Sequence, residues 1–155
     1  MIVWYDVDMS TTTAPKAPSF TPPAPSAEFL ATQKVAQRLV DLCNAGKNIE
    51  AIRELYADNA RHIEAFSMPG CPSLTTGKES LLQRAEHWVK TTKIHSASCG
   101  KPLINGDQFV CAMAMDCTGT EGPMANQRMN MTETALYTVK NGKITEAKFF
   151  YSCGM

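Results

Sequence analysis

The hydrophobic pattern changes its period near residue 90, and this change limits the folds that the chain can adopt. Before that point apolar residues recur at the spacing of helices, and after it apolar and polar residues alternate as they do in strands. Asn-Gly pairs at 105–106 and 141–142 interrupt the alternating half, and each is a strong hairpin signal because both residues accept positive φ. The sequence therefore predicts an α+β fold, with three N-terminal helices packed on a mostly antiparallel sheet.

The helices are expected to start at recognisable capping residues. Ser26 is a good N-cap for the first helix, and Asn48 is expected to cap the second. Thr76-Gly77-Lys78-Glu79 fits a capping box, in which the Thr76 and Glu79 side chains satisfy reciprocal backbone N–H groups. The expected helices span Ala27 to about Asn44, Asn48 to about Tyr56, and the segment from this box to about Lys90.

One strand is expected among the helices and four strands after them. A Pro- and Thr-rich segment, residues 1–26, precedes this pattern and cannot build a core, so we divide the chain into an N-terminal arm, 1–26, and one domain, 27–155. The expected strands are Arg61–Phe66, Lys93–Ser98, Phe109–Thr118, Asn126–Val139 and Ile144–Ser152.

Composition excludes several classes of function. Lys and Arg together number 15, as do Asp and Glu, so we expect neither nucleic acid nor a membrane surface as a partner. No apolar run is long enough to span a bilayer. The six cysteines form no Cys-x-x-Cys pair and no secretory leader precedes them, which predicts six reduced thiols in a cytoplasmic protein. The three histidines lack ligand-like spacing and there is no Gly-rich phosphate loop, so neither a metal nor a cofactor is expected.

The order of several short motifs resembles a known family. Gly46–Ile52 followed by Leu55–Ala60, then Thr76–Leu81, and finally Tyr137–Ile144 are similar to the corresponding segments of the SnoaL-like branch of the nuclear transport factor 2 superfamily. The resemblance covers about residues 27–152. It implies a cone-shaped roll, in which a curved sheet wraps around three helices and encloses a pocket, in a homodimer. The superfamily includes ketosteroid isomerases, polyketide cyclases, dehydratases and epoxide hydrolases, and fold alone does not choose among them.

Four side chains are candidates for acid–base chemistry. Glu64 matches the position of the carboxylate base in the ketosteroid isomerases that the chain resembles, and desolvation in an apolar pocket would suit it to proton abstraction beside a carbonyl. That isomerase is itself a standard example of such tuning. His62 shares a strand face with Glu64 and can form an acid–base couple with it, and Glu133 and Asp116 are alternative second groups. Leu39 or Val40 stands where those isomerases have a hydrogen-bonding tyrosine, so steroid isomerisation itself is not expected.

The resemblance further implies an apolar ligand pocket and a second copy of the chain as partner. By position, the pocket would be lined by Leu39, Trp88, Ala135, Tyr137, Phe149 and Tyr151. We therefore expect an isomerase, cyclase or dehydratase acting on a small apolar molecule. The alternative is a non-catalytic ligand-binding or dimerisation module.

Four methionines alternate on two neighbouring expected strands. They are Met113, Met115, Met129 and Met131, and their adaptable thioethers suit either a ligand pocket or a sheet face buried in a dimer or core. We favour the dimer or core interpretation, with the dimer joined through the outer face of the sheet.

Overall fold

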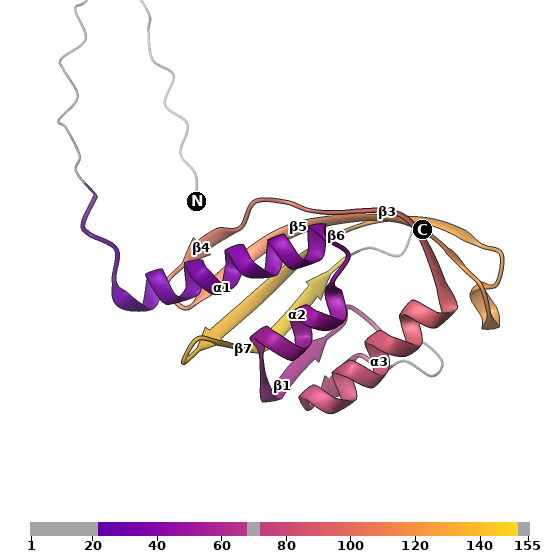
Figure 1. Cartoon of the computed structure of the whole chain (residues 1–155), viewed down its shortest axis with the longest axis horizontal. Coiled ribbons are helices and arrows are strands. Elements are labelled where there is room, and N and C mark those ends of the chain that lie inside the picture. The colour runs from indigo at the N-terminus through magenta and orange to yellow at the C-terminus, as the bar shows by residue number, and fades with distance from the viewer. Residues whose placement is uncertain (1–21, 68–71, 152–155) are drawn as a thin grey trace, which may run out of the picture.

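A computed structural model describes residues 22–67 and 72–151 of the chain, so most of the predicted arm lies outside the described residues. Three α-helices lie against one face of a single sheet (Figure 1). The helices are α1 (Ala27–Asn44), α2 (Asn48–Leu55) and α3 (Lys78–Thr91), and a short 3₁₀ helix, η1, spans Gly122–Met124. Their order and approximate bounds are those that the hydrophobic pattern predicted.

Only one of the three expected capping arrangements is present. The Ser26 hydroxyl accepts a hydrogen bond from Phe29 N at 3.1 Å, as expected of an N-cap. Asn48 is instead the first helical residue of α2, after an N-cap at Lys47 that makes no side-chain bond. The predicted capping box is also wrong, because α3 is preceded by Gly77 at φ 93°, where no side-chain cap is formed.

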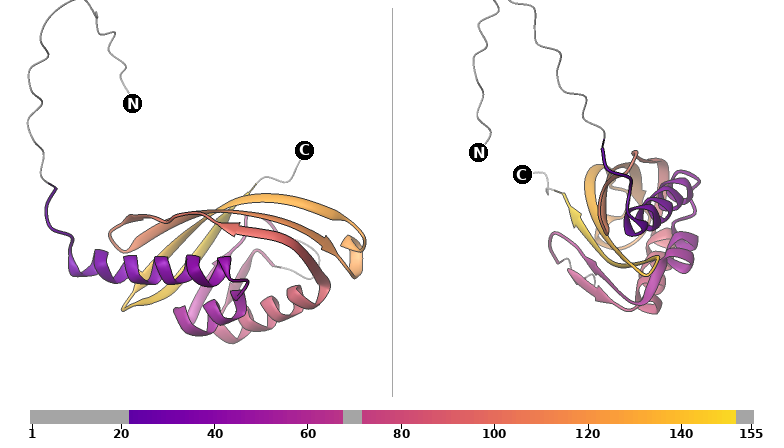
Figure 2. Two further views of the ribbon diagram at one scale, coloured as in Figure 1. Left: turned by 45° about the horizontal axis from the view of Figure 1, so that its top comes forward. Right: turned by 90° about the vertical axis from the view of Figure 1, so that its left-hand side faces the viewer.

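The sheet has seven strands, and it is mixed, mostly antiparallel and unclosed. The order is β2-β1-β7-β6-β5-β3, with β4 also paired to β5, and β1 runs parallel to β7. Seen end-on, the strands curve around the side that carries the helices (Figure 2). The bounds are β1 (Tyr56–Ile63), β2 (Leu74–Thr76), β3 (Thr92–Cys99), β4 (Leu103–Asn105), β5 (Gln108–Gly119), β6 (Arg128–Lys140) and β7 (Lys143–Phe150). This architecture confirms the predicted α+β class.

Two local predictions differ from the structure. The first strand was expected at Arg61–Phe66, but β1 starts at Tyr56, which pairs with Ile144 of β7, and ends at Ile63. The 141–142 hairpin has both turn residues at positive φ, as expected, with Asn141 at 52° and Gly142 at 70°. In the other hairpin Asn105 pairs with Gln108, so Gly106 (φ 57°) and Asp107 form the turn.

The core fills the space between the helices and one face of the sheet. Strand residues alternate between the two faces. The face towards the helices, here called the inner face, holds the buried residues of the central strands, such as Phe109, Cys111, Ala135 and Tyr137. Residues between them, such as Ala112 and Thr134, are exposed on the opposite or outer face. Among the described helices, none is long and apolar enough to cross a membrane.

Candidate functional site

Glu64 lies directly after β1, at the edge of the space between α3 and the sheet. Its backbone N–H extends the strand pairing by donating to Ser73 O at 2.7 Å. Arg84 Nη2, on α3, donates to Glu64 Oε1 at 2.6 Å, and the Tyr151 hydroxyl donates to Glu64 Oε2 at 3.1 Å. The Glu64 side chain is only 15% exposed. Each carboxylate oxygen of this mostly buried side chain therefore accepts a hydrogen bond from a donor.

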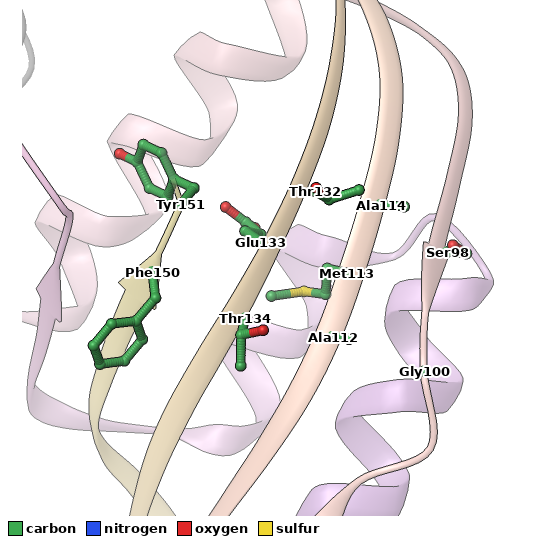
Figure 3. A pocket seen from close by; sticks show the side chains of 10 residues that line it. All are labelled: Ser98, Gly100, Ala112, Met113, Ala114, Thr132, Glu133, Thr134, Phe150 and Tyr151. Atoms are coloured by element: carbon green, nitrogen blue, oxygen red, sulfur yellow. The ribbon is translucent and has the colours of Figure 1, made fainter. Parts of the chain in front are cut away.

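Glu133 is a second carboxyl group near the first. It lies on the inner face of β6, opposite Met113 of β5. Burial, and to a smaller extent the negative charge of Glu64, raise its pKa to about 7. Figure 3 shows the Glu133 carboxyl group turned towards the ring of Tyr151. Glu133 is therefore partly protonated near neutral pH.

Tyr151 connects these two acids. Its pKa is raised to about 12, first by burial and then by the charge of Glu64, the hydrogen bond to Glu64 and the charge of Glu133. The phenol therefore keeps its proton and donates a hydrogen bond to Glu64. We call Glu64, Arg84, Tyr151 and Glu133 the carboxylate cluster.

His62 lies beside this cluster as a neutral side chain. A hydrogen bond of 3.1 Å joins its Nε2 to the Tyr56 hydroxyl, and the Phe149 ring meets it edge-on with centroids 4.9 Å apart. Loss of hydration, and to a smaller extent the Arg84 charge, lower the pKa of His62 to about 3. Near neutral pH His62 can therefore orient a ligand but carries no charge.

Asp116 is not part of the group. It pairs across the strands with Asn130 rather than with a core residue, and Arg128 binds both of its carboxylate oxygens, at 2.9 and 2.6 Å. The Arg128 hydrogen bonds lower the pKa of Asp116. The structure thus brings Glu64, His62 and Glu133 together on the inner side and places Asp116 apart, in an ion pair on the outer face.

The residues expected to line the pocket divide into two sets. Leu39, Ala135 and Tyr137 are at most 3% exposed and belong to the core, where Tyr137 stacks on Phe109. Trp88, Phe149 and Tyr151 are half-buried. The structure therefore leaves only the second set accessible to a ligand.

Arg84 and Tyr56 are site residues that the sequence analysis missed. Arg84 lies three residues after Leu81 on α3, so the helical spacing that pointed to the buried Leu81 places Arg84 on the same side. Tyr56 was expected at the end of the second helix, but it is the first residue of β1 and its hydroxyl is hydrogen-bonded to His62. In both cases the sequence indicated a residue on a buried face, but it could not indicate which distant side chain that residue contacts.

A hollow of about 500 Å³ lies over β3, β5, β6 and the end of β7 (Figure 3). Most of its lining residues belong to the outer face by strand alternation, whereas Met113, Glu133 and Tyr151 belong to the inner side. Its outer-face members are Ser98, Ala112, Ala114, Thr132, Thr134 and Phe150.

Two observations concern metal ligands and thiols in the part of the chain that the structure describes. There, no group of three or more His, Cys, Asp or Glu side chains is arranged to hold a metal ion. Cys43, Cys99, Cys111 and Cys117 are free thiols, and the predictions for Cys71 and Cys153 lie outside the described residues.

The chain was compared with protein-family models and with solved structures. The model of the SnoaL-like domain matches residues 30–151. A crystal structure from Mesorhizobium loti, provisionally described as a SnoaL-like polyketide cyclase, is 36% identical, with a TM-score of 0.70, over 76% of this chain and 97% of that one.

More distant structures share the fold alone. A Jannaschia protein with the same provisional description is 15% identical, with a TM-score of 0.63, over 83% of this chain and 90% of that one. An LEH-like epoxide hydrolase of M. tuberculosis is 9% identical, with a TM-score of 0.61, over 81% and 85%. No functionally curated protein matches the chain. The family model and the 36% identical relative agree, and the chain belongs to the SnoaL-like domain family.

Proposed function

We propose that this protein binds a small apolar molecule and catalyses a proton transfer on it, as in an isomerisation, cyclisation or dehydration. The observation that carries the proposal is a pair of neighbouring carboxyl groups with different surroundings: Arg84 and Tyr151 bind the Glu64 carboxylate, whereas burial and the nearby Glu64 raise the pKa of Glu133 to about 7. Environments that separate two carboxyl groups in this way commonly mark the base and the acid of a catalytic pair. Here Glu64 is the base, and Glu133 in its protonated form is the acid.

The roles follow from what each group contacts. Glu64 accepts a proton from carbon beside a carbonyl, while Glu133 donates a hydrogen bond or a proton to the oxygen on which charge develops. Arg84 and Tyr151 hold the Glu64 carboxylate in place. His62, fixed by Tyr56 and neutral, is a positioning residue for the substrate.

The test is exchange of α-protons with deuterated water, followed by NMR for a panel of cyclic and linear ketones whose binding is measured in parallel by calorimetry. Glu64→Gln and Glu133→Gln should each lower the exchange rate by about 10²–10⁴-fold, since they remove the base and the acid. Asp116→Asn is the matched control, because it makes the same carboxylate-to-amide change on the outer face and should leave the rate unchanged.

The pH profile gives a second readout. Because Glu133 must carry its proton and its pKa is raised to about 7, the rate should fall as pH rises above 7. Full exchange in Glu64→Gln, or a rate that keeps rising beyond pH 8, would contradict the assignment of roles.

Non-catalytic ligand binding is the second candidate. The observation in its favour is the short bond of 2.6 Å between Arg84 and Glu64, because a carboxylate neutralised in this way is a weaker base. Ketones that bind without any α-proton exchange would support this alternative over the enzyme.

A further inference from the structure

Three thiols gather where the end of α1 meets β3 and β5. Cys43 lies in the last turn of α1, Cys99 is the last residue of β3, and Cys111 is on the inner face of β5. Cys99 and Cys111 belong to the core, and Cys43 packs against that core while it stays half-buried. We call these three residues the thiol cluster. None of them is a member of the carboxylate cluster, so their chemistry is independent of the proposed function.

Cys99 is the central member of the thiol cluster. The thiols of Cys43 and Cys111 each form a side-chain hydrogen bond with the Cys99 sulfur. The backbone of Cys99 is held from the helix side, because the Asn44 side chain donates to Cys99 O at 3.0 Å and accepts from Cys99 N at 2.8 Å. Asn44 directly follows Cys43 in the chain. These two bonds therefore keep the last turn of α1, and Cys43 with it, against the strand that carries Cys99.

Strand register decides which neighbour of Cys99 can form a disulfide with it. Cys99 is paired with Met113 across β3 and β5, so Cys111, two residues before Met113, is its diagonal neighbour. Diagonal neighbours on antiparallel strands have Cα atoms roughly 7–8 Å apart. Disulfides usually join residues whose Cα atoms are less than about 7 Å apart, so the sheet holds Cys99 and Cys111 beyond that limit. Cys43 approaches from a helix, and no strand register sets its distance from Cys99.

The surroundings of these thiols differ from those of an inert core cysteine. Isolated thiols in apolar surroundings are unreactive, because the thiolate is the nucleophile and burial disfavours it. Here hydrogen bonds from the thiols of Cys111 and Cys43 lower the pKa of Cys99, since S–H donors stabilise its thiolate. Cys43 is only half-buried, which leaves one side of the cluster accessible to a molecule as small as hydrogen peroxide. The cluster thus combines a nucleophilic sulfur with partial exposure.

We propose that Cys99 and Cys43 are an oxidation site, at which a peroxide converts the two thiols into one disulfide that joins β3 to α1. The Cys99 sulfur attacks one peroxide oxygen and becomes a sulfenic acid, and the other oxygen leaves as water with the thiol proton. The Cys43 sulfur then displaces the sulfenic hydroxyl, which leaves as a second water with the Cys43 proton. The two thiols together lose two electrons, and hydrogen peroxide is reduced to two molecules of water.

The disulfide encloses residues 44–98, the segment that carries His62, Glu64 and Arg84. Closing a long loop with a covalent bond stabilises a protein, in the usual account by restricting the unfolded chain. The bond also makes the attachment of α1 to β3 covalent, where the reduced protein relies on packing and on the Asn44 hydrogen bonds. Oxidation should therefore raise the unfolding temperature, and a thiol reductant should reverse the change.

The test is a peptide map of the full chain before and after exposure to hydrogen peroxide at pH 7. Remaining thiols are alkylated in denaturant, and the protein is digested with trypsin in the absence of reductant. Trypsin releases Cys43 in the peptide 39–47 and Cys99 in the peptide 94–128. Peroxide should join these two peptides, and fragmentation should assign the bond to Cys43 and Cys99. The unfolding temperature should rise by at least about 5 °C and return to its first value after treatment with dithiothreitol.

Alanine variants of the thiol cluster supply the controls. Cys43→Ala, at a half-buried position, should abolish both the cross-linked peptide and the rise in unfolding temperature, and Cys99→Ala should do the same. Cys111→Ala is the matched control, because it makes the same change within the cluster but should leave the cross-link intact. Its disulfide should form more slowly than that of the wild type, since Cys99 loses one S–H donor. The wild-type peptide map decides the question even where a variant fails to fold.

Several results would overturn the proposal. One is a disulfide between Cys99 and Cys111, and another is a disulfide that joins either proposed thiol to Cys71 or Cys153. A sulfinic acid at Cys99 beside an unmodified Cys43 would show that Cys43 does not reach the oxidised sulfur. Full alkylation of both thiols after peroxide would show that the cluster is inert.

Discussion

At the scale of single residues, the site rests on two glutamates with different surroundings. Glu64 has a guanidinium and a phenol as donors, whereas Glu133 lies beside Met113 and within the field of Glu64. Burying a carboxylate without a partner costs free energy, and a neighbouring cation offsets that cost. Because of this contrast, the stability of the protein should depend on pH through Glu133.

Glu133→Gln should stabilise the protein at pH 8 and have little effect near pH 4. The folded-state pKa of Glu133 is raised to about 7, so the unfolded chain releases this proton first as pH rises. The free energy of unfolding of the wild type therefore falls by on the order of 2 kcal/mol between about pH 4.5 and 7, and the glutamine variant avoids this fall. Urea unfolding of both proteins from pH 4 to 8 checks this, and parallel pH profiles would refute it.

Arg84→Gln should destabilise the protein by about 2–3 kcal/mol at pH 7, because it leaves the mostly buried Glu64 carboxylate without its cation. Arg53→Gln is the matched control, since the Arg53–Glu86 pair joins side chains that are 59% and 42% exposed and should contribute less than about 1 kcal/mol. Thermal unfolding compares the two. Equal losses in both variants would mean that Glu64 does not depend on Arg84.

At the scale of elements, the end of α1 is tied to β3 by one side chain. Asn44 Nδ2 donates to Cys99 O at 3.0 Å, and Cys99 N donates to Asn44 Oδ1 at 2.8 Å. Asn44→Ala should cost about 1–3 kcal/mol because it leaves both backbone groups of a buried residue unpaired. Chemical denaturation measures the loss, with Asn59→Ala at an exposed position of β1 as control. A loss no larger than that of the control would show that packing alone holds α1.

Element order and type could be predicted from the sequence because hydrophobic period and turn residues are local properties. The three helices and the 141–142 hairpin needed nothing more. The start of β1 and the cap of α3 could not be predicted, because strand pairing with β7 and a positive φ at Gly77 decide them.

The site shows the same division between local and distant information. Alternation along β1 placed His62 with Glu64, but Arg84 and Tyr151 reach Glu64 from distant parts of the chain. Alternation also left open which face of β5 and β6 the helices cover. That choice decides that Glu133 lies near Glu64 and that Asp116 lies apart from it on the outer face.

At the scale of the whole molecule, the outer face offers a surface for a second copy. Ala112, Ala114, Thr132 and Thr134 are exposed there around the hollow, and Phe150 beside them is 47% exposed. Small and threonine side chains permit close approach of two sheets. Light scattering at micromolar concentration should therefore give about twice 17.0 kDa, and Thr134→Arg should shift the mass towards one chain. A monomeric wild type would contradict this prediction.

The parallel pairing of β1 with β7 also affects the order in which contacts form during folding. Apart from the three-residue β2, the partner of β1 among the described strands is β7, which lies far from it in the sequence, and Tyr151, the hydroxyl donor to Glu64, follows β7 directly. Pairing of such distant segments requires costly loop closure before it is rewarded, which slows folding. The contact between Tyr151 and Glu64 is therefore expected to be among the last to form during folding. In stopped-flow refolding, Tyr151→Phe should accelerate unfolding while leaving the folding rate nearly unchanged, and a slower folding rate would reverse this order.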